Sequence, residues 1–144
     1  MRRLRFALRL LVAASLAAAA AARAEIVVVV HPDSPVQALS PRDVSDLYLG
    51  RTRALGSTRR ALVLDHPRDS ERRREFFNRV NGMDISRVNA YWARLQFSGD
   101  ALPPAAMRDD RSVLDIVRRQ RDAIGYVEAA HADESVRIVL RLKD

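Results

Sequence analysis

The chain has 144 residues, contains no cysteine and carries a formal net charge of +7. The absence of cysteine excludes a disulfide framework, a thiol nucleophile, a lipid-attachment cysteine and every cysteine metal site. Its length suffices for one compact domain with its own core, but not for two domains of ordinary size.

The first 24 residues predict a secretory signal peptide. Arginines precede an apolar run from Leu10 to Ala22, and Ala22-Arg23-Ala24 carries small residues where a signal peptidase cleaves. The apolar core of about 13 residues is shorter than the roughly 20 that a spanning helix needs, which disfavours an uncleaved membrane anchor. We therefore expect cleavage after Ala24, a periplasmic location and a mature domain of residues 25–144.

Removal of this leader changes the charge of the chain. The leader contains arginines and no acidic residue, so the net charge of the mature domain is only about +2. Nucleic-acid binding by an exported protein would need a concentrated basic face. The mature composition gives no support to that function.

The first half of the mature chain predicts two strands and three helices. Residues 26–30 are a continuous Ile-Val run without polar alternation, which is typical of a strand buried on both faces. Ser40 followed by Pro41 predicts a helix start, and Gly50 predicts its end. The other elements are a strand at 61–64, a helix capped by Asp69 or Ser70 and ended by Asn81-Gly82, and a helix from Asp84 to Gly99.

The second half predicts one helix and two strands. Asp109 or Asp110 can cap the helix. Its inward apolar residues are predicted to be Val113, Ile116 and Val117. Residues 123–127 form the next predicted strand, and residues 136–142 form a final edge strand. The whole pattern predicts an α/β fold with a mixed sheet flanked by helices.

Five short motifs follow one another along the mature chain. They are Leu47-Tyr48-Leu49-Gly50-Arg51, Asp65-His66-Pro67-Arg68-Asp69-Ser70, Tyr91-Trp92, Gln96-Phe97-Ser98-Gly99 and Ala123-Ile124-Gly125-Tyr126-Val127. This ordered set resembles the phosphate-binding protein family of bacterial ABC importers, specifically its short stand-alone members. The resemblance covers nearly all of the mature chain.

Full-length members of that family have two α/β lobes that close on an oxyanion, which is held by hydroxyls, backbone N–H groups and usually one arginine. The resemblance implies that this chain is a single periplasmic-binding-protein-like lobe. It implies non-covalent binding of phosphate or another small oxyanion, linked to ABC-type import, without catalysis, cofactor or metal. A helix N-terminus suits this role because its unpaired N–H groups favour an anion.

Four residues that follow the strand at 61–64 are the candidates for oxyanion binding: Ser70, Arg68, Arg72 and His66. Ser70 matches the family's binding loop, and His66 falls near the family's arginine. Arg68 and Arg72 can supply charge-assisted hydrogen bonds. Protonation of His66 would strengthen anion binding at lower pH.

The same loop departs from the family pattern. Glu71 and Arg72 stand where the family has a glycine and a threonine, which adds negative charge and removes a close backbone approach. The alternative interpretation is a solvated helix face on which Glu71 and Glu75 pair with nearby arginines.

Three other motif residues have structural alternatives. Gly50 can be only a helix terminus, and Gly125 only a place where backbones approach closely. Tyr126 can be core or rim packing rather than a ligand contact.

A single lobe covers only part of a small ligand. We therefore expect a free monomer to bind phosphate weakly. A second copy of the chain in a homodimer, or docking to a membrane partner such as an importer, would complete the cleft.

Catalysis is a second class of function. Asp65-His66 ends one strand, Ser70 follows, and His31 ends the first strand, so the two histidines could lie side by side. No metal-ligand spacing accompanies these histidines and no G-x-S-x-G elbow is present, which disfavours an enzyme. His131 lies in a polar loop and is predicted to be only solvated.

A third class is an envelope interaction or sensory module that has lost its solute. An exposed apolar patch with Tyr48, Leu49 or Tyr126 would indicate a protein partner, whereas a small polar cleft with Ser70 and Arg68 would indicate a solute.

Overall fold

The computed structural model describes residues 23–58 and 60–144. The predicted signal peptide therefore lies almost wholly outside the described residues. The elements are β1 (Ile26–Val30), α2 (Pro41–Tyr48), β2 (Leu62–Asp65), α3 (Glu71–Asn81), α4 (Ile85–Ser98), β3 (Ala105–Ala106), α5 (Asp110–Val117), β4 (Ala123–Glu128), a 3-10 helix (Ala129–His131) and β5 (Arg137–Leu142). No helix in this part of the chain is both long and apolar enough to cross a bilayer.

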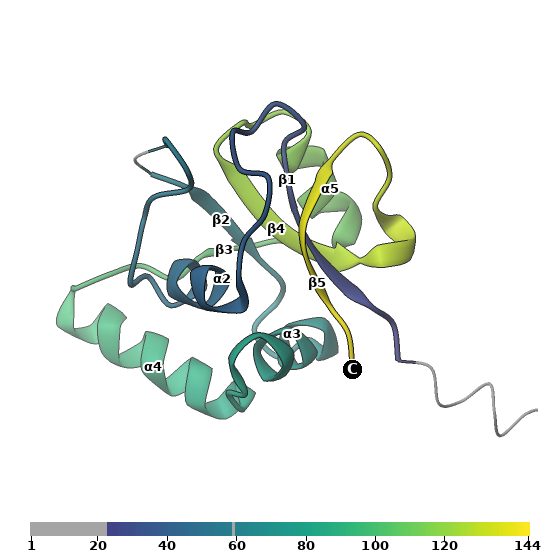
Figure 1. Cartoon of the computed structure of the whole chain (residues 1–144). Helices are drawn as coiled ribbons and strands as arrows, with labels where there is room; N and C mark the ends of the chain where they lie inside the picture. The colour runs from purple at the N-terminus through teal and green to yellow at the C-terminus, as the bar shows by residue number, and fades with distance from the viewer. Residues whose placement is uncertain (1–22, 59) are drawn as a thin grey trace, which may run out of the picture.

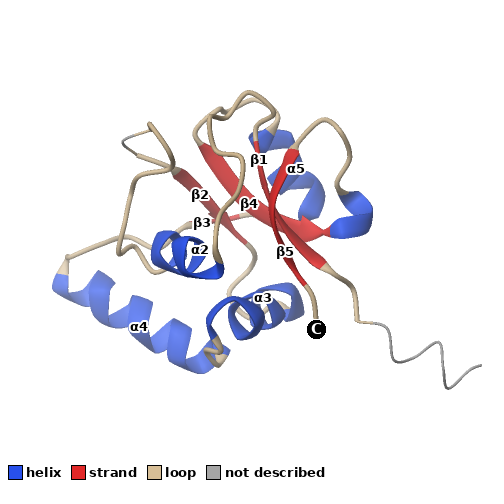
Figure 2. Ribbon diagram, viewed as in Figure 1, coloured by secondary structure: helices blue, strands red, loops and turns tan. Residues whose placement is uncertain are grey.

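The strands form one mixed sheet in the order β3-β2-β4-β1-β5. β1 pairs antiparallel with both β4 and β5, whereas β2 pairs parallel with β3 and β4. Figure 2 shows helices beside this sheet on both sides. The predicted α/β fold with a mixed, helix-flanked sheet is confirmed, and so is the edge position of the last strand.

The Ile-Val run of β1 is buried at every position because both faces of the sheet are covered. Ile26, Val28 and Val30 belong to a core packed under α2, α3 and α4. Val27 and Val29 belong to a second core under α5. Figure 1 shows α2, α3 and α4 together on one side of the sheet and α5 on the other. This arrangement explains why the strand lacks polar alternation.

The helix starts follow the predicted caps. Ser40 and Asp43 form a reciprocal capping box at α2, and hydrogen bonds from Ser40 lower the pKa of the Asp43 carboxyl. Of the paired alternatives in the sequence, Ser70 caps α3 and Asp109 caps α5. Asp84 caps α4 as predicted. The strand β3 was not predicted, because two residues after a Pro-Pro pair carry no periodic signal.

An aromatic cluster fills the core between the sheet and α2 and α3. The Tyr126 ring stacks on Phe76 at 3.7 Å between centroids, and Tyr48 meets Phe76 edge-on at 4.7 Å. The Tyr48 hydroxyl donates to the Leu64 carbonyl at 2.8 Å. Tyr48, Leu49 and Tyr126 are all buried. The packing interpretation of Tyr126 is confirmed, and the three residues line no exposed apolar patch.

Gly125 lies where α5 packs tightly against the sheet. A Cβ atom placed on Gly125 would lie 2.4 Å from the Cγ1 atom of Val113. Gly125 is therefore a site of close packing, but the group that approaches it is the Val113 side chain, not a second backbone as the structural interpretation expected. Gly50 adopts a φ of 68° directly after α2, which agrees with its interpretation as a helix terminus.

We expect Gly125→Ala to lower the free energy of unfolding by about 1–3 kcal/mol, the usual cost of overpacking a core. Urea denaturation of the purified domain measures this change. Val113→Ala in the same chain makes room for the added methyl group, so the double variant should lose less than the sum of the two single losses. Additive losses would show that the contact with Val113 is not the cause.

Candidate anion-binding cleft

An open cleft of about 640 Å³ lies at the carboxyl ends of the parallel strands β2, β3 and β4. We call it the strand-end cleft. It is lined by His66, Pro67, Ser70 and Arg72 after β2, by Arg108, Asp109, Asp110, Arg111, Leu114 and Arg118 after β3, and by His131 after β4. In open α/β sheets, ligands bind outside the carboxyl ends of the strands. This position makes the cleft the candidate site.

Ser70 lies where α3 begins. Its hydroxyl oxygen accepts a hydrogen bond from the Arg73 backbone N–H at 3.3 Å, and its own N–H donates to the Pro67 carbonyl. The hydroxyl proton of Ser70 is not used in these bonds. Ser70 therefore combines a structural cap with a donor on the cleft wall.

His66 is buried directly beneath the cleft. Its Nε2 atom lies 2.9 Å from the Tyr126 carbonyl oxygen and 3.5 Å from Oδ1 of Asp110. A carbonyl oxygen can only accept, so this arrangement requires the proton on Nε2. His66 is thus already oriented by two groups of the protein itself.

Arg72 crosses from α3 toward α5 and β4. One of its guanidinium nitrogens lies 2.9 Å from Oε2 of Glu128, and its Nε lies 3.6 Å from Oδ1 of Asp110. The side chain is only 21% exposed. Arg72 is therefore held in the cleft wall by two carboxylates.

The Asp110 carboxylate contacts three other residues of the cleft lining: His66, Arg72 and His131. It is only 9% exposed, in the first turn of α5. Its Oδ2 atom accepts from the Glu128 backbone N–H at 2.9 Å and lies 2.7 Å from Nδ1 of His131. Together with the contacts to His66 and Arg72, this makes Asp110 an internal anion in a donor-rich setting. The prediction that His131 is only solvated is wrong, because His131 contacts this carboxylate.

Arg68 and Glu71 lie outside the cleft lining. Arg68 is exposed, and its carbonyl oxygen accepts a hydrogen bond from Arg73 at 3.0 Å. Glu71 is exposed and pairs with Arg74 at 3.0 Å, and Glu75 pairs with Arg79 at 3.6 Å. The alternative interpretation is confirmed in that both glutamates pair with nearby arginines, but only Glu71 lies on a solvated face, since the side chains of Glu75 and Arg79 are only 22% and 8% exposed. The negative charge of Glu71 does not face the cleft.

A buried ion pair supports the cleft from below. The Asp65 carboxylate accepts from Nε of Arg73 at 2.8 Å, from the Tyr126 hydroxyl at 2.5 Å and from the His66 backbone N–H at 2.8 Å. Burial and the neighbouring Asp65 charge hold the pKa of Tyr126 well above its ordinary value. The hydroxyl therefore stays protonated and keeps donating to Asp65.

His31 does not join this site. β1 runs antiparallel to β4, with Val30 opposite Ile124, whereas β2 runs parallel to β4, with Val63 opposite Ile124. The carboxyl ends of β1 and β2 therefore lie at opposite edges of the sheet. The idea that His31 and His66 could lie side by side is wrong.

Several lining residues were not predicted to bind a ligand, among them Asp110, His131 and the arginines after β3. Asp110, His131 and Glu128, which pairs with Arg72 beside the lining, form one cluster. The spacing Glu128-Ala-Ala-His131 is a Glu-x-x-His pattern and was the available signal. Ligand atoms of these three residues lie within 4.8 Å of one another, so they could hold a cation. Arg72 already supplies positive charge to both carboxylates, and a metal ion would have to replace it.

Comparison with known proteins identifies the fold. No protein-family model matches the chain, and a search of curated proteins finds no match. Among solved structures, the chain is similar to an ABC-type phosphate transport receptor from Vibrio cholerae, with 16% identity and a TM-score of 0.63 over 81% of this chain and 47% of that one. PstS from Borrelia burgdorferi gives 9% identity and a TM-score of 0.61 over the same shares.

A third similar structure is assigned as a phosphate ABC transporter substrate-binding protein from Clostridium perfringens and contains bound phosphate. It shows 19% identity and a TM-score of 0.62 over 81% of this chain and 45% of that one. The chain thus spans less than half the length of each of these proteins. At these identities the likeness shows the fold, which is that of periplasmic-binding-protein-like proteins.

Proposed function

We propose that this chain is an exported solute-binding protein that holds phosphate or another small oxyanion non-covalently in the strand-end cleft. The observation that carries this proposal is that four arginines and two histidines line a cleft beside the starts of α3 and α5. Guanidinium groups bind oxyanions through charge-assisted hydrogen bonds, and helix starts add N–H donors. The similar structures support a binding role at the level of the fold.

Each residue has a different role in this proposal. The Ser70 hydroxyl and the first N–H groups of α3 donate to the anion, and Arg72 supplies the central charge. His66 lies beneath the anion and is a weaker candidate contact, because its Nε2–H already faces the Tyr126 carbonyl. Arg68, which lies outside the lining, contributes only long-range attraction.

The cleft is open to solvent, so a partner protein is needed to cover a bound anion. One lobe leaves a bound anion in contact with water, which weakens each electrostatic interaction. We infer that a second copy of the chain, or a membrane component of an importer, covers the cleft in the working complex. Sedimentation of the mature domain with and without phosphate tests the second copy. A monomer that binds phosphate tightly would contradict this inference.

Calorimetric titration of residues 25–144 with phosphate tests the proposed function, with sulfate as the competing anion. We expect saturable binding, and we expect Arg72→Gln to weaken it at least about tenfold, because a hydrogen bond to a charged group contributes about 1.5–3 kcal/mol. Arg74→Gln is the matched control, since Arg74 lies on the same helix and pairs with the exposed Glu71. Equal losses in both variants would contradict a direct role for Arg72.

Ser70→Ala should also weaken binding, but it removes the cap of α3 at a cost of about 1 kcal/mol in stability. Its unfolding must therefore be measured alongside its affinity. Ser70→Gly loses the same hydroxyl at little capping cost, so similar affinities in the two variants would assign the effect to the hydroxyl.

The alternative function is an envelope interaction or sensory module that has lost solute binding. The observation that favours it is the pairing of Arg72 with Asp110 and Glu128, which already satisfies the central charge of the cleft. No binding heat at millimolar phosphate, in a folded domain, would favour this alternative.

A further inference from the structure

We propose that the chain has a second binding site, for a small organic anion with an apolar body, in a pocket between α4 and the start of β2. We call it the α4 pocket. It is an open pocket of about 480 Å³ and shares no lining residue with the strand-end cleft. The proposal is therefore independent of the proposed function.

The apolar part of the α4 pocket is built by residues from four segments. Its members are Leu47 of α2, Leu62 and Val63 of β2, Trp92 of α4, and Leu102, Pro103 and Pro104 of the loop that follows α4. Leu102 is 83% exposed, so its side chain stands in water in the absence of a ligand. Covering such a side chain with an apolar group is favourable.

Gly50 allows Trp92 to pack closely against the backbone in the apolar part of the α4 pocket. Its φ of 68° turns the chain after α2, and a Cβ atom there would lie 2.9 Å from the Cη2 atom of Trp92. The missing side chain lets the indole ring lie directly against the backbone. The indole is thereby fixed as a rigid part of the pocket floor, although Trp92 is only 4% exposed and little of its surface can contact a ligand.

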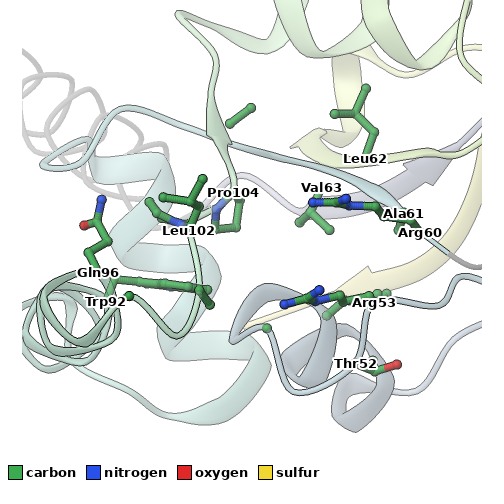
Figure 3. Close-up of a pocket in the computed structure, with 16 residues that line it drawn as sticks. Thr52, Arg53, Arg60, Ala61, Leu62, Val63, Trp92, Gln96, Leu102 and Pro104 are labelled. Atoms are coloured by element: carbon green, nitrogen blue, oxygen red, sulfur yellow. The ribbon is translucent and has the colours of Figure 1, made fainter.

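The charge of the pocket defines the ligand class. Arg53 and Arg60 line it, and no lining residue is acidic. Within the described part of the chain, neither arginine forms an ion pair. Figure 3 shows both guanidinium groups pointing the same way, toward the side of the pocket formed by Trp92, Leu102 and Pro104. Two like charges that line one pocket without a counter-ion are suited to a carboxylate or sulfonate.

The two pockets therefore differ in charge balance. In the strand-end cleft, Asp109 and Asp110 offset part of the arginine charge, whereas the α4 pocket has no such offset. The amide of Gln96 and the hydroxyl of Thr52 add neutral hydrogen-bonding groups at the rim. An anion with a phenyl-sized apolar body satisfies both parts of the α4 pocket, which neither inorganic phosphate nor a neutral apolar molecule does.

Trp92 gives a direct readout, because it is the single tryptophan of the chain. We would titrate the mature domain with 3-phenylpropionate and follow tryptophan fluorescence. 3-Phenylpropan-1-ol carries the same body without the charge, and acetate carries the charge without the body. We expect a saturable response to 3-phenylpropionate at concentrations at least about tenfold below those needed for either comparison compound.

Arg53→Gln combined with Arg60→Gln should weaken the response to 3-phenylpropionate at least about tenfold and leave the response to the alcohol unchanged. Arg87→Gln is the matched control, since Arg87 is an exposed arginine on α4 outside the pocket lining. Leu102→Ser tests the apolar wall without disturbing the core, because this side chain is exposed. It should weaken binding of both the acid and the alcohol.

The proposal is overturned if no probe gives a saturable response. Equal responses to the acid and the alcohol would overturn it as well, as would a response that the double arginine variant retains. Inorganic phosphate that changes the fluorescence as strongly as 3-phenylpropionate would contradict the assigned ligand class. Calorimetry with phosphate at the strand-end cleft remains a separate result, so failure of one site does not decide the other.

Discussion

Asp65→Ala should lower the free energy of unfolding by about 3–5 kcal/mol, the cost of breaking a buried ion pair from one side. Arg73 is 5% exposed, and its Nε donates to Asp65 at 2.8 Å. Loss of the carboxylate would leave this guanidinium charged and buried, with only neutral acceptors on Arg68 and Asn89. Because whole domains are stable by only about 5–15 kcal/mol, the effect should be visible as a large shift of the urea midpoint.

Two further variants separate the charge from the other contacts of Asp65. Arg73→Met together with Asp65→Ala removes both charges, so the double variant should lose less than the sum of the single losses. Asp46→Ala is the control for an exposed pair, since Asp46 contacts Arg51 at 3.4 Å near the surface, and it should cost less than about 1 kcal/mol. If Asp65→Ala lowered the free energy of unfolding by no more than Asp46→Ala, burial of the Asp65–Arg73 pair would make no contribution to the loss.

The elements of this fold were readable from the sequence because their signals are local. Ser40, Asp84 and the Gly82 and Gly99 ends are caps that act within one turn, and the structure uses all four. The Ile-Val run predicted a strand buried on both faces, because a sheet with one face in water needs polar residues at alternate positions. Leu114 was not predicted to face inward, yet it is buried, whereas Ile116 is only half-buried.

The arrangement of the strands could not be read in this way. The placement of His31 depended on whether β1 runs parallel or antiparallel to β2 and β4, and a fully apolar strand carries no pattern that decides this. The direction of each strand depends on the path of the connections between the strands. Those paths depend in turn on contacts between residues that are distant in the sequence. The same limit applies to the two-residue strand β3, which exists only because β2 offers it a partner.

Only one wall of the candidate site, the wall that follows β2, could be predicted from the sequence. His66, Ser70 and Arg72 lie close together in the sequence, and the structure brings all three to the strand-end cleft. The opposite wall comes from Asp110 and His131, about 40 or more residues further along the chain. Neither resembled a binding motif, although Glu128 and His131 have the spacing of a ligand pair. The contacts of Asp110 and Glu128 with Arg72 could be known only from the fold.

Asp110→Asn should raise the affinity for phosphate at least about tenfold. The Asp110 carboxylate lies 3.6 Å from Arg72 and 2.7 Å from His131, in the position of an internal competitor for any bound oxyanion. Two like charges about 4 Å apart repel by roughly 4 kcal/mol at an effective dielectric constant of 20, and even a strongly screened fraction of this energy exceeds a tenfold change. Calorimetry on the variant and the parent domain gives the ratio directly.

The matched control for this prediction is Glu71→Gln, which also removes one carboxylate near the start of α3 but does so outside the cleft. It should change the affinity less than about threefold, because exposed charges are screened. A lower affinity in Asp110→Asn at unchanged stability would show instead that the carboxylate accepts a proton-bearing oxygen of the ligand. Absence of binding in both the parent and the variant would remove the strand-end cleft as an anion site.

Asp110→Asn should also reduce stability by about 1–2 kcal/mol, because the carboxylate accepts from the Glu128 backbone and favours the first turn of α5. We expect the variant to bind phosphate more tightly and to unfold more easily. This combination identifies a carboxylate that stabilises the empty cleft and competes with the ligand. If both quantities fell together, Asp110 would be a structural residue of α5 alone. Opposite changes in the two measurements therefore separate an internal competitor from a simple helix contact.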